Sequence, residues 1–190
     1  DGTLISEEGN AKITARGVLQ IKKLSAKDNA TVEADHDVTL NEAEAGMLAI
    51  SSGGSVNAGT LTATTGDAKV TAKTDATIGT LKAEVGSATV KATEGKLDVT
   101  TLNAKEHAAL TSGSAMEVTE VTAGTLAAES TAGSVKAGTL TAKTGEASVT
   151  AKTDATIGTL KAEAGSATVK APEGKLDVTT LNAKKHAELT

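Results

Sequence analysis

The sequence predicts an all-β protein: a right-handed parallel β-helix, or β-solenoid, of about ten coils with a sequence period of 19–21 and three short strands per coil. Three observations predict it. A leucine-centred phrase returns at every 18th to 21st position, strictly alternating apolar and polar residues lie between its copies, and Phe, Tyr and Trp are absent. A core without aromatic side chains must be narrow and lined by small aliphatic groups, as Ala and Thr, about a third of the 190 residues, would provide.

The first strand of each coil carries the phrase Thr-Leu-x-Ala, as in Thr60-Leu61-Thr62-Ala63. One such coil cannot bury its apolar face alone, so stacking many coils is required for stability. The apolar anchors of the ten coils are Leu4, Leu24, Ala43, Leu61, Leu81, Leu102, Val121, Leu140, Leu160 and Leu181.

The second strand follows as an alternating phrase such as Ala68-Lys69-Val70-Thr71-Ala72, the period-2 pattern of a strand with one buried face. Turns such as Thr65-Gly66-Asp67 separate the phrases, and we expect their glycines to supply a positive φ. A third apolar position predicts the third strand. It is represented by Ile78, Leu97, Val118, Ile157 and Leu176.

Other all-β architectures fit the pattern less well. Hairpins favour Asn-Gly or Asp-Gly turns, and neither dipeptide lies between the predicted strands. A β-sandwich needs units of about 100 residues. Parallel crossover connections are usually right-handed, which favours a right-handed helix.

A longer repeat contains the short one. Residues 51–111 reappear as residues 130–190, and 51 of 61 aligned positions are identical. The offset between the two blocks equals four coils, so the duplication is in register. We therefore expect one β-helix domain over residues 1–190, with degraded coils in 1–50 and an intervening coil in 112–129, and we interpret it as part of a longer chain.

Composition narrows the function classes. The formal net charge is −5, which argues against nucleic acid as a partner. The absence of Cys excludes disulfides and cysteine-ligated zinc. No run of 18 apolar residues is present, so no membrane-spanning helix is expected.

Candidate catalytic and metal-binding residues are few. His107 and His186 are copies of each other, four coils or roughly 19 Å apart, too far to share a metal ion. The triplet Asp35-His36-Asp37 could touch a cation, but a polar turn is the preferred interpretation. We expect no metal and no cofactor.

Paired carboxylates also give no unique site. Asp75 and Asp98 recur as Asp154 and Asp177, which is repetition, whereas a catalytic site breaks symmetry. Pectinolytic β-helix enzymes, the main enzymatic alternative, would need long loops that this sequence lacks. We therefore expect no enzyme and no small-molecule substrate.

Two surface arrays have a functional and a structural interpretation. A threonine column could bind ice, but Thr is also a good strand residue, which is the preferred interpretation; its members are Thr60, Thr80, Thr101, Thr139, Thr159 and Thr180. A spaced basic stripe could bind heparan-like glycans, but nearby glutamates favour a mixed-charge face; the stripe consists of Lys82, Lys91, Lys161 and Lys170.

The Gly-Thr-Leu-x-Ala phrase, the Gly-x-Ala-x-Val-x-Ala phrase and the sequence period of 19–21 resemble the repeat shaft of filamentous haemagglutinins and of contact-dependent inhibition exoproteins. The resemblance covers nearly the whole chain and is clearest in residues 51–190; self-associating autotransporter adhesins build similar helices.

The resemblance implies two-partner secretion through an outer-membrane pore, display at the bacterial cell surface, and a role in adhesion, delivery or virulence. We expect a shaft segment that projects a distal adhesive or effector domain toward a host or target-cell receptor. The alternative is a module whose solenoid face binds glycan directly or self-associates. The isolated chain is expected to be monomeric.

Overall fold

Residues 2–190, the part that the computed structural model describes, form twenty strands and no helix. The strands make two parallel sheets of ten. One sheet holds β1 (Gly2–Ser6), β3 (Leu19–Ala26), β5 (Val38–Ala45), β7 (Val56–Ala63), β9 (Ala76–Ala83), β11 (Leu97–Ala104), β13 (Met116–Ala123), β15 (Val135–Ala142), β17 (Ala155–Ala162) and β19 (Leu176–Ala183). The other holds β2 (Ala11–Ala15), β4 (Asn29–Ala34), β6 (Met47–Ser52), β8 (Ala68–Ala72), β10 (Ala88–Ala92), β12 (His107–Ser112), β14 (Thr125–Ser130), β16 (Ala147–Ala151), β18 (Ala167–Lys170) and β20 (Ala187–Leu189).

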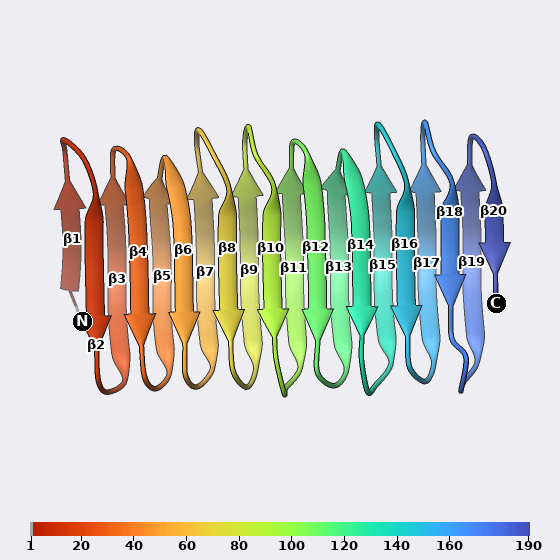
Figure 1. Ribbon diagram of the computed structural model, residues 1–190, viewed down its shortest axis with the longest axis horizontal. Coiled ribbons are helices and arrows are strands. Elements are labelled where there is room, and N and C mark those ends of the chain that lie inside the picture. Colours follow the sequence, from red (N-terminus) through yellow and green to blue (C-terminus); the bar gives the residue numbers. More distant parts are fainter. Residues whose placement is uncertain (1) are drawn as a thin grey trace.

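Each coil consists of one odd-numbered strand followed by one even-numbered strand, and each strand pairs with its equivalent one coil away. In Figure 1 the chain runs up the far side and down the near side while it advances from left to right, which is a right-handed coil. The predicted β-solenoid is confirmed. Ten strands per sheet correspond to the ten predicted coils.

The predicted anchors stack as one continuous row. Leu61 pairs with Leu81, and Leu81 pairs with Leu102, all of them fully buried. The even-numbered strands add a second row, in which Val70 pairs with Val90. Side chains of both sheets meet in one hydrophobic core that extends from Ala11 to Ala171.

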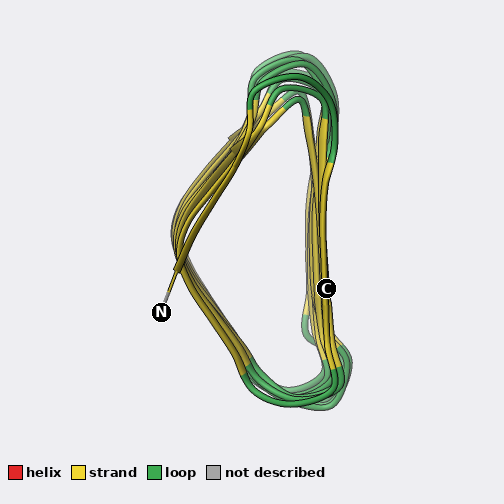
Figure 2. Ribbon diagram, turned by 90° about the vertical axis from the view of Figure 1, so that its left-hand side faces the viewer, coloured by secondary structure: helices red, strands yellow, loops and turns green. Residues whose placement is uncertain are grey.

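The coil has three sides but only two strands. In β7, Val56 and Ala58 point inward, Gly59 and Thr60 both face solvent, and Leu61 points inward again. Two successive outward residues change the phase and bend the strand, so the predicted third strand is the first half of a continuous bent strand. Figure 2 shows the resulting three-sided outline, with the bent strands on the left and the straight even-numbered strands on the right.

The five residues of the third apolar position are not all equivalent, contrary to what the sequence pattern predicts, because two of them lie in a different inward row. Leu97 pairs with Ala76, whereas Ile78 pairs with Val99. Leu97 and its copy Leu176 therefore lie in the neighbouring row. The reason is turn length, because residues 93–96 connect β10 to β11 with one residue more than the 73–75 turn of the preceding coil.

The predicted role of the turn glycines is also wrong. Among residues 2–190 only Gly9 has a positive φ, of 113°. From Gly46 onward, the glycines are explained by close contact between coils, whereas Gly17 has no atom within 4 Å of a Cβ position. A Cβ at Gly46, for example, would lie 2.5 Å from the carbonyl oxygen of Asp28 in the preceding coil. Stacking distance, rather than backbone conformation, selects glycine here.

Candidate binding surfaces

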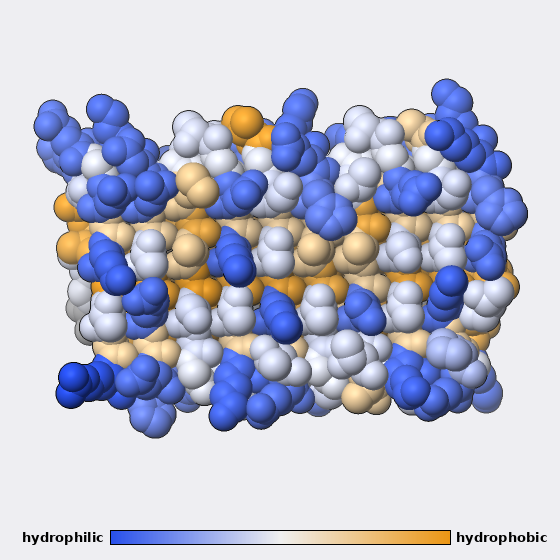
Figure 3. Space-filling view, viewed as in Figure 1, coloured by the Kyte–Doolittle hydropathy of each residue, from blue (hydrophilic) through white to orange (hydrophobic). Residues whose placement is uncertain are grey.

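Outward side chains form columns along the axis, because equivalent residues of successive coils lie in register. The even-numbered strands are straight and present one flat face, which we call the flat face; Figure 3 views it directly. The bent odd-numbered strands present the other two sides. A binding surface on this fold is therefore a set of neighbouring columns.

The four lysines of the predicted basic stripe lie on two different faces. Lys82 and Lys161 occupy one column on the second half of the odd-numbered strands, aligned with Thr62 and Thr141 of the preceding coils. Lys91 and Lys170 occupy a column of the flat face, where Lys91 aligns with Thr111. Within each pair the lysines are four coils, or roughly 19 Å, apart. The structure does not bring the four charges into one stripe.

Acidic neighbours also offset the positive charge of individual lysines on the odd-numbered strands. Lys161 Nζ donates a hydrogen bond to Glu163 Oε1 at 2.7 Å. That hydrogen bond, together with the charge of Lys161, lowers the pKa of the Glu163 carboxyl. In the same way, hydrogen bonding to Glu117 raises the pKa of Lys136. Both pairs are solvent-exposed, so they contribute little to stability.

The threonine column is real but interrupted. Thr60, Thr80 and Thr101 lie in register on successive coils. Glu120 takes the next place, and the column resumes at Thr139. The adjacent outward column contains Lys82 and Asn103. The surface therefore lacks an unbroken threonine lattice.

Several of the candidate carboxylates accept hydrogen bonds from backbone N–H groups at the corners of the coils. Asp75 Oδ1 accepts a hydrogen bond from the Lys96 backbone N–H at 2.7 Å, and its copy Asp154 does the same for Lys175 at 2.8 Å. Asp37, in the candidate cation triplet, accepts from the Ser55 backbone N–H at 2.7 Å. Each of these carboxylates links one coil to the next.

The histidines do not gather at a centre. His107 Nδ1 lies 2.6 Å from Thr125 Oγ1, an interaction between neighbouring coils. Within residues 2–190, no group of three or more His, Asp or Glu side chains is arranged to hold a metal ion. Nor do these residues include a helix long and apolar enough to cross a membrane.

The corner that leads into each even-numbered strand varies in length along the rod. It has four residues before β2, β8, β10, β16 and β18, but only one to three before β4, β6, β12, β14 and β20. These corners rise to different heights along the upper edge in Figure 1. Long and short corners thus alternate in pairs, with the same four-coil period as the sequence duplication.

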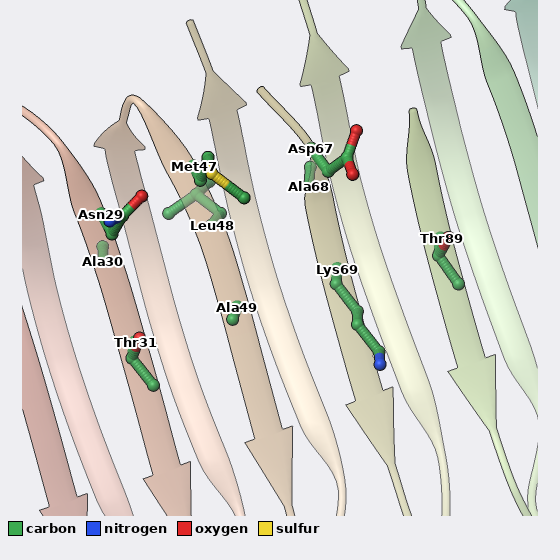
Figure 4. Close-up of a pocket in the computed structure, with 10 residues that line it drawn as sticks. All are labelled: Asn29, Ala30, Thr31, Met47, Leu48, Ala49, Asp67, Ala68, Lys69 and Thr89. Atoms are coloured by element: carbon green, nitrogen blue, oxygen red, sulfur yellow. The ribbon is translucent and has the colours of Figure 1, made fainter. Parts of the chain in front are cut away.

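A shallow depression of about 390 Å³ lies on the flat face beside the short corner at Gly46. Its lining includes Thr31, Met47, Ala49 and Lys69. Figure 4 shows these side chains spread over four neighbouring strands, β4 to β10, with no convergence on a common point.

Sequence reasoning missed the other charged residues of the flat face, namely Lys12, Glu33, Lys69, Glu129 and Glu188. The signal was present in the alternating phrases, whose second and fourth residues face outward. Assigning those positions to columns required the strand register. In one column, Lys12 pairs with Thr31 at one end, and Thr168 pairs with Glu188 at the other end.

The fold and its surfaces define this chain as a parallel β-solenoid repeat protein. No protein-family model, curated protein or solved structure matches it.

Proposed function

We propose that this chain is a structural shaft segment of a secreted bacterial surface protein, which holds a distal adhesive or effector domain away from the cell. The observation that supports the proposal is the uninterrupted coil. Within residues 2–190, every connection between strands has between one and five residues, so no inserted loop builds a cleft on any face.

The stacking of equivalent residues suits this role. Backbone hydrogen bonds run from coil to coil along the axis, and aliphatic rows fill the interior. Nine steps of ~4.8 Å between ten coils give a rod roughly 43 Å long. Length grows with coil number while the cross-section stays constant, which is the property required of a spacer.

The resemblance noted in the sequence supports the rest of the proposal. A shaft of this type is exported through an outer-membrane secretion pore and displayed at the cell surface. The receptor on the host or target cell is then contacted by the distal domain, and the solenoid itself sets the distance.

Removal of residues 112–190 from the full-length protein tests the proposal, because these residues amount to four whole coils. We expect the displayed protein to be shorter by roughly 19 Å, measured by electron microscopy, with unchanged receptor binding. If binding is lost while the distal domain remains folded and displayed, the shaft interpretation is wrong and the solenoid is itself the binding module.

A further inference from the structure

We infer that two copies of this chain pair face to face through their flat faces, with the solenoid axes antiparallel and a two-fold axis running between β10 and β12, parallel to the strands. The pairing goes beyond a spacer role and revises the expectation of a monomer. It follows from the distribution of charge along the flat face, the variation in corner length, and the area of the face.

Two central columns carry the side chains of the flat face. The upper column contains Lys12, Thr31, Ala49, Lys69, Thr89, Ala109, Ala127, Ser148, Thr168 and Glu188. The lower column contains Thr14, Glu33, Ser51, Thr71, Lys91, Thr111, Glu129, Thr150 and Lys170. Each end of the face carries one positive and one negative side chain, Lys12 with Glu33 at one end and Lys170 with Glu188 at the other. Small uncharged side chains fill most of the middle.

A two-fold axis between β10 and β12 brings opposite charges together. It places β2 opposite β20 of the second copy, so Lys12 faces Glu188. It also places β4 opposite β18, so Glu33 faces Lys170. Symmetry makes each contact twice. Lys12 and Glu33 already form an ion pair within one chain, with Lys12 Nζ 3.2 Å from Glu33 Oε2, so a four-charge cluster would form at each end of the interface.

The remaining charges of the two columns are also accommodated. Lys91 faces Thr111, Glu129 faces Thr71 and Lys69 faces Ala127, so no like charges oppose one another. Complementary charge across an interface fixes register and suppresses wrong pairings.

Neighbouring registers are less favourable. Moving the two-fold axis by half a coil toward the amino end places Lys91 opposite itself. Moving it by half a coil toward the carboxyl end places Lys91 opposite Glu129 but loses both end clusters, and it sets the long corner before β8 against the equally long corner before β16.

The pattern of corner lengths follows the same two-fold symmetry. With the axis between β10 and β12, each four-residue corner lies beside a shorter corner of the other copy at all five pairs of strands. The long corners before β16 and β18 then lie opposite the depression beside the short corner at Gly46, and Figure 4 shows the residues that line this depression. The four-coil alternation of long and short corners is thus self-complementary under this symmetry.

The area and shape of the face suit a dimer. Ten strands, each about five residues long, give a face of roughly 700 Å², close to the ~800 Å² that each partner buries in a stable interface. The coils superimpose closely when viewed along the axis in Figure 2, so the sheet is nearly untwisted. Flat sheets of many strands are typically stabilised by stacking.

Charge reversal tests the pairing in the chain as it is. We expect sedimentation equilibrium to show a dimer that weakens with added salt, and Lys170→Glu to weaken it roughly tenfold by setting two Glu pairs against each other. Glu33→Lys alone has the same effect, and the double variant restores association. Lys91→Glu is the matched control, because Lys91 is the copy of Lys170 on the same column but faces Thr111. It should change the dimer constant much less.

Cysteine cross-linking tests the register directly, since the native chain has no Cys. Ala49 on β6 faces Ser148 on β16 of the second copy. Mixing the Ala49→Cys and Ser148→Cys variants under mild oxidation should give a disulfide-linked dimer, whereas each variant alone should not.

Three outcomes overturn the inference. The first is a chain that stays monomeric at its highest soluble concentration. The second is open-ended growth insensitive to Lys170→Glu, which would indicate association through the ends of the solenoid. The third is a dimer more sensitive to Lys91→Glu than to Lys170→Glu, which would place Lys91 opposite Glu129 in the neighbouring register. Circular dichroism of each variant establishes that it is folded.

Discussion

At the scale of single residues, the environment of each side chain depends on whether it belongs to an inward row or to an outward column. Leu81 is fully buried and stacks between Leu61 and Leu102, whereas its neighbour Lys82 is exposed. Residues one apart on a strand face opposite sides of a sheet, so the same substitution should be far more destabilising at Leu81 than at Lys82.

We expect Leu81→Asp to lower the free energy of unfolding by several kcal/mol, because it buries a charge without a partner. Lys82→Asp should change it by no more than about 0.5 kcal/mol. Urea unfolding followed by circular dichroism measures both. Equal losses for the two variants would show that the inward and outward rows are wrongly assigned.

Glycine positions give a second test at this scale. A Cβ at Gly46 would lie 2.5 Å from the Asp28 carbonyl oxygen and 2.9 Å from Thr65 Oγ1. Gly46→Ala should therefore destabilise the protein by about 1–3 kcal/mol, as overpacking does. Gly17 has no atom within 4 Å of the corresponding position, and Gly17→Ala is the control, expected to be neutral or slightly stabilising. A neutral Gly46→Ala would mean that the corners tolerate wider spacing between coils.

At the scale of elements, the unit of this fold is the whole coil. The two strands of a coil belong to different sheets, so the core between the sheets forms only when both strands are present. The register of both sheets must advance together, which requires that insertions and deletions come in complete coils.

Deleting residues 76–96 removes β9, β10 and their turns, and it brings Leu97 into the place of Ala76. We expect this variant to fold cooperatively with one coil fewer. Deleting residues 86–95 removes half a coil and exchanges inward and outward rows. It should aggregate through exposed strand edges. Circular dichroism and size-exclusion chromatography compare the two, and a soluble, folded 86–95 deletion would contradict the coil as the unit.

At the scale of the whole molecule, stability is expected to be a sum over coils and their interfaces, since each coil contacts mainly its neighbours. The present last coil, with β19 and β20, is a near copy of the coil with β11 and β12. A chain ending at residue 111 therefore ends in a coil of nearly the same sequence as residues 176–190.

We expect residues 1–111 to fold alone, with lower stability and a rod roughly 19 Å shorter by small-angle X-ray scattering. The radius of the cross-section should be unchanged, which distinguishes loss of coils from partial unfolding. An unfolded 1–111 fragment would show that the coils depend on distant parts of the chain.

The sequence by itself determined the coil. Composition required a narrow aliphatic interior, the spacing of Leu61, Leu81 and Leu102 defined the period, and alternation in Ala68–Ala72 distinguished buried from exposed positions. These are local properties, and a repeat presents them many times. The lysines at 82, 91, 161 and 170 were identified from the same pattern, although their relation in space was not.

Only the tertiary structure decided how faces are composed. The bend at Gly59 and Thr60 joined two predicted strands into one. A one-residue difference in turn length moved Leu97 to another row, and close stacking of coils selected glycine at position 46. Lys82 was separated from Lys91 by the corner between them, while Lys12 and Glu188, near opposite ends of the sequence, became the two ends of one column. The physical reason is that a surface on a solenoid is assembled across coils, by register and corner geometry, whereas the sequence pattern describes one coil at a time.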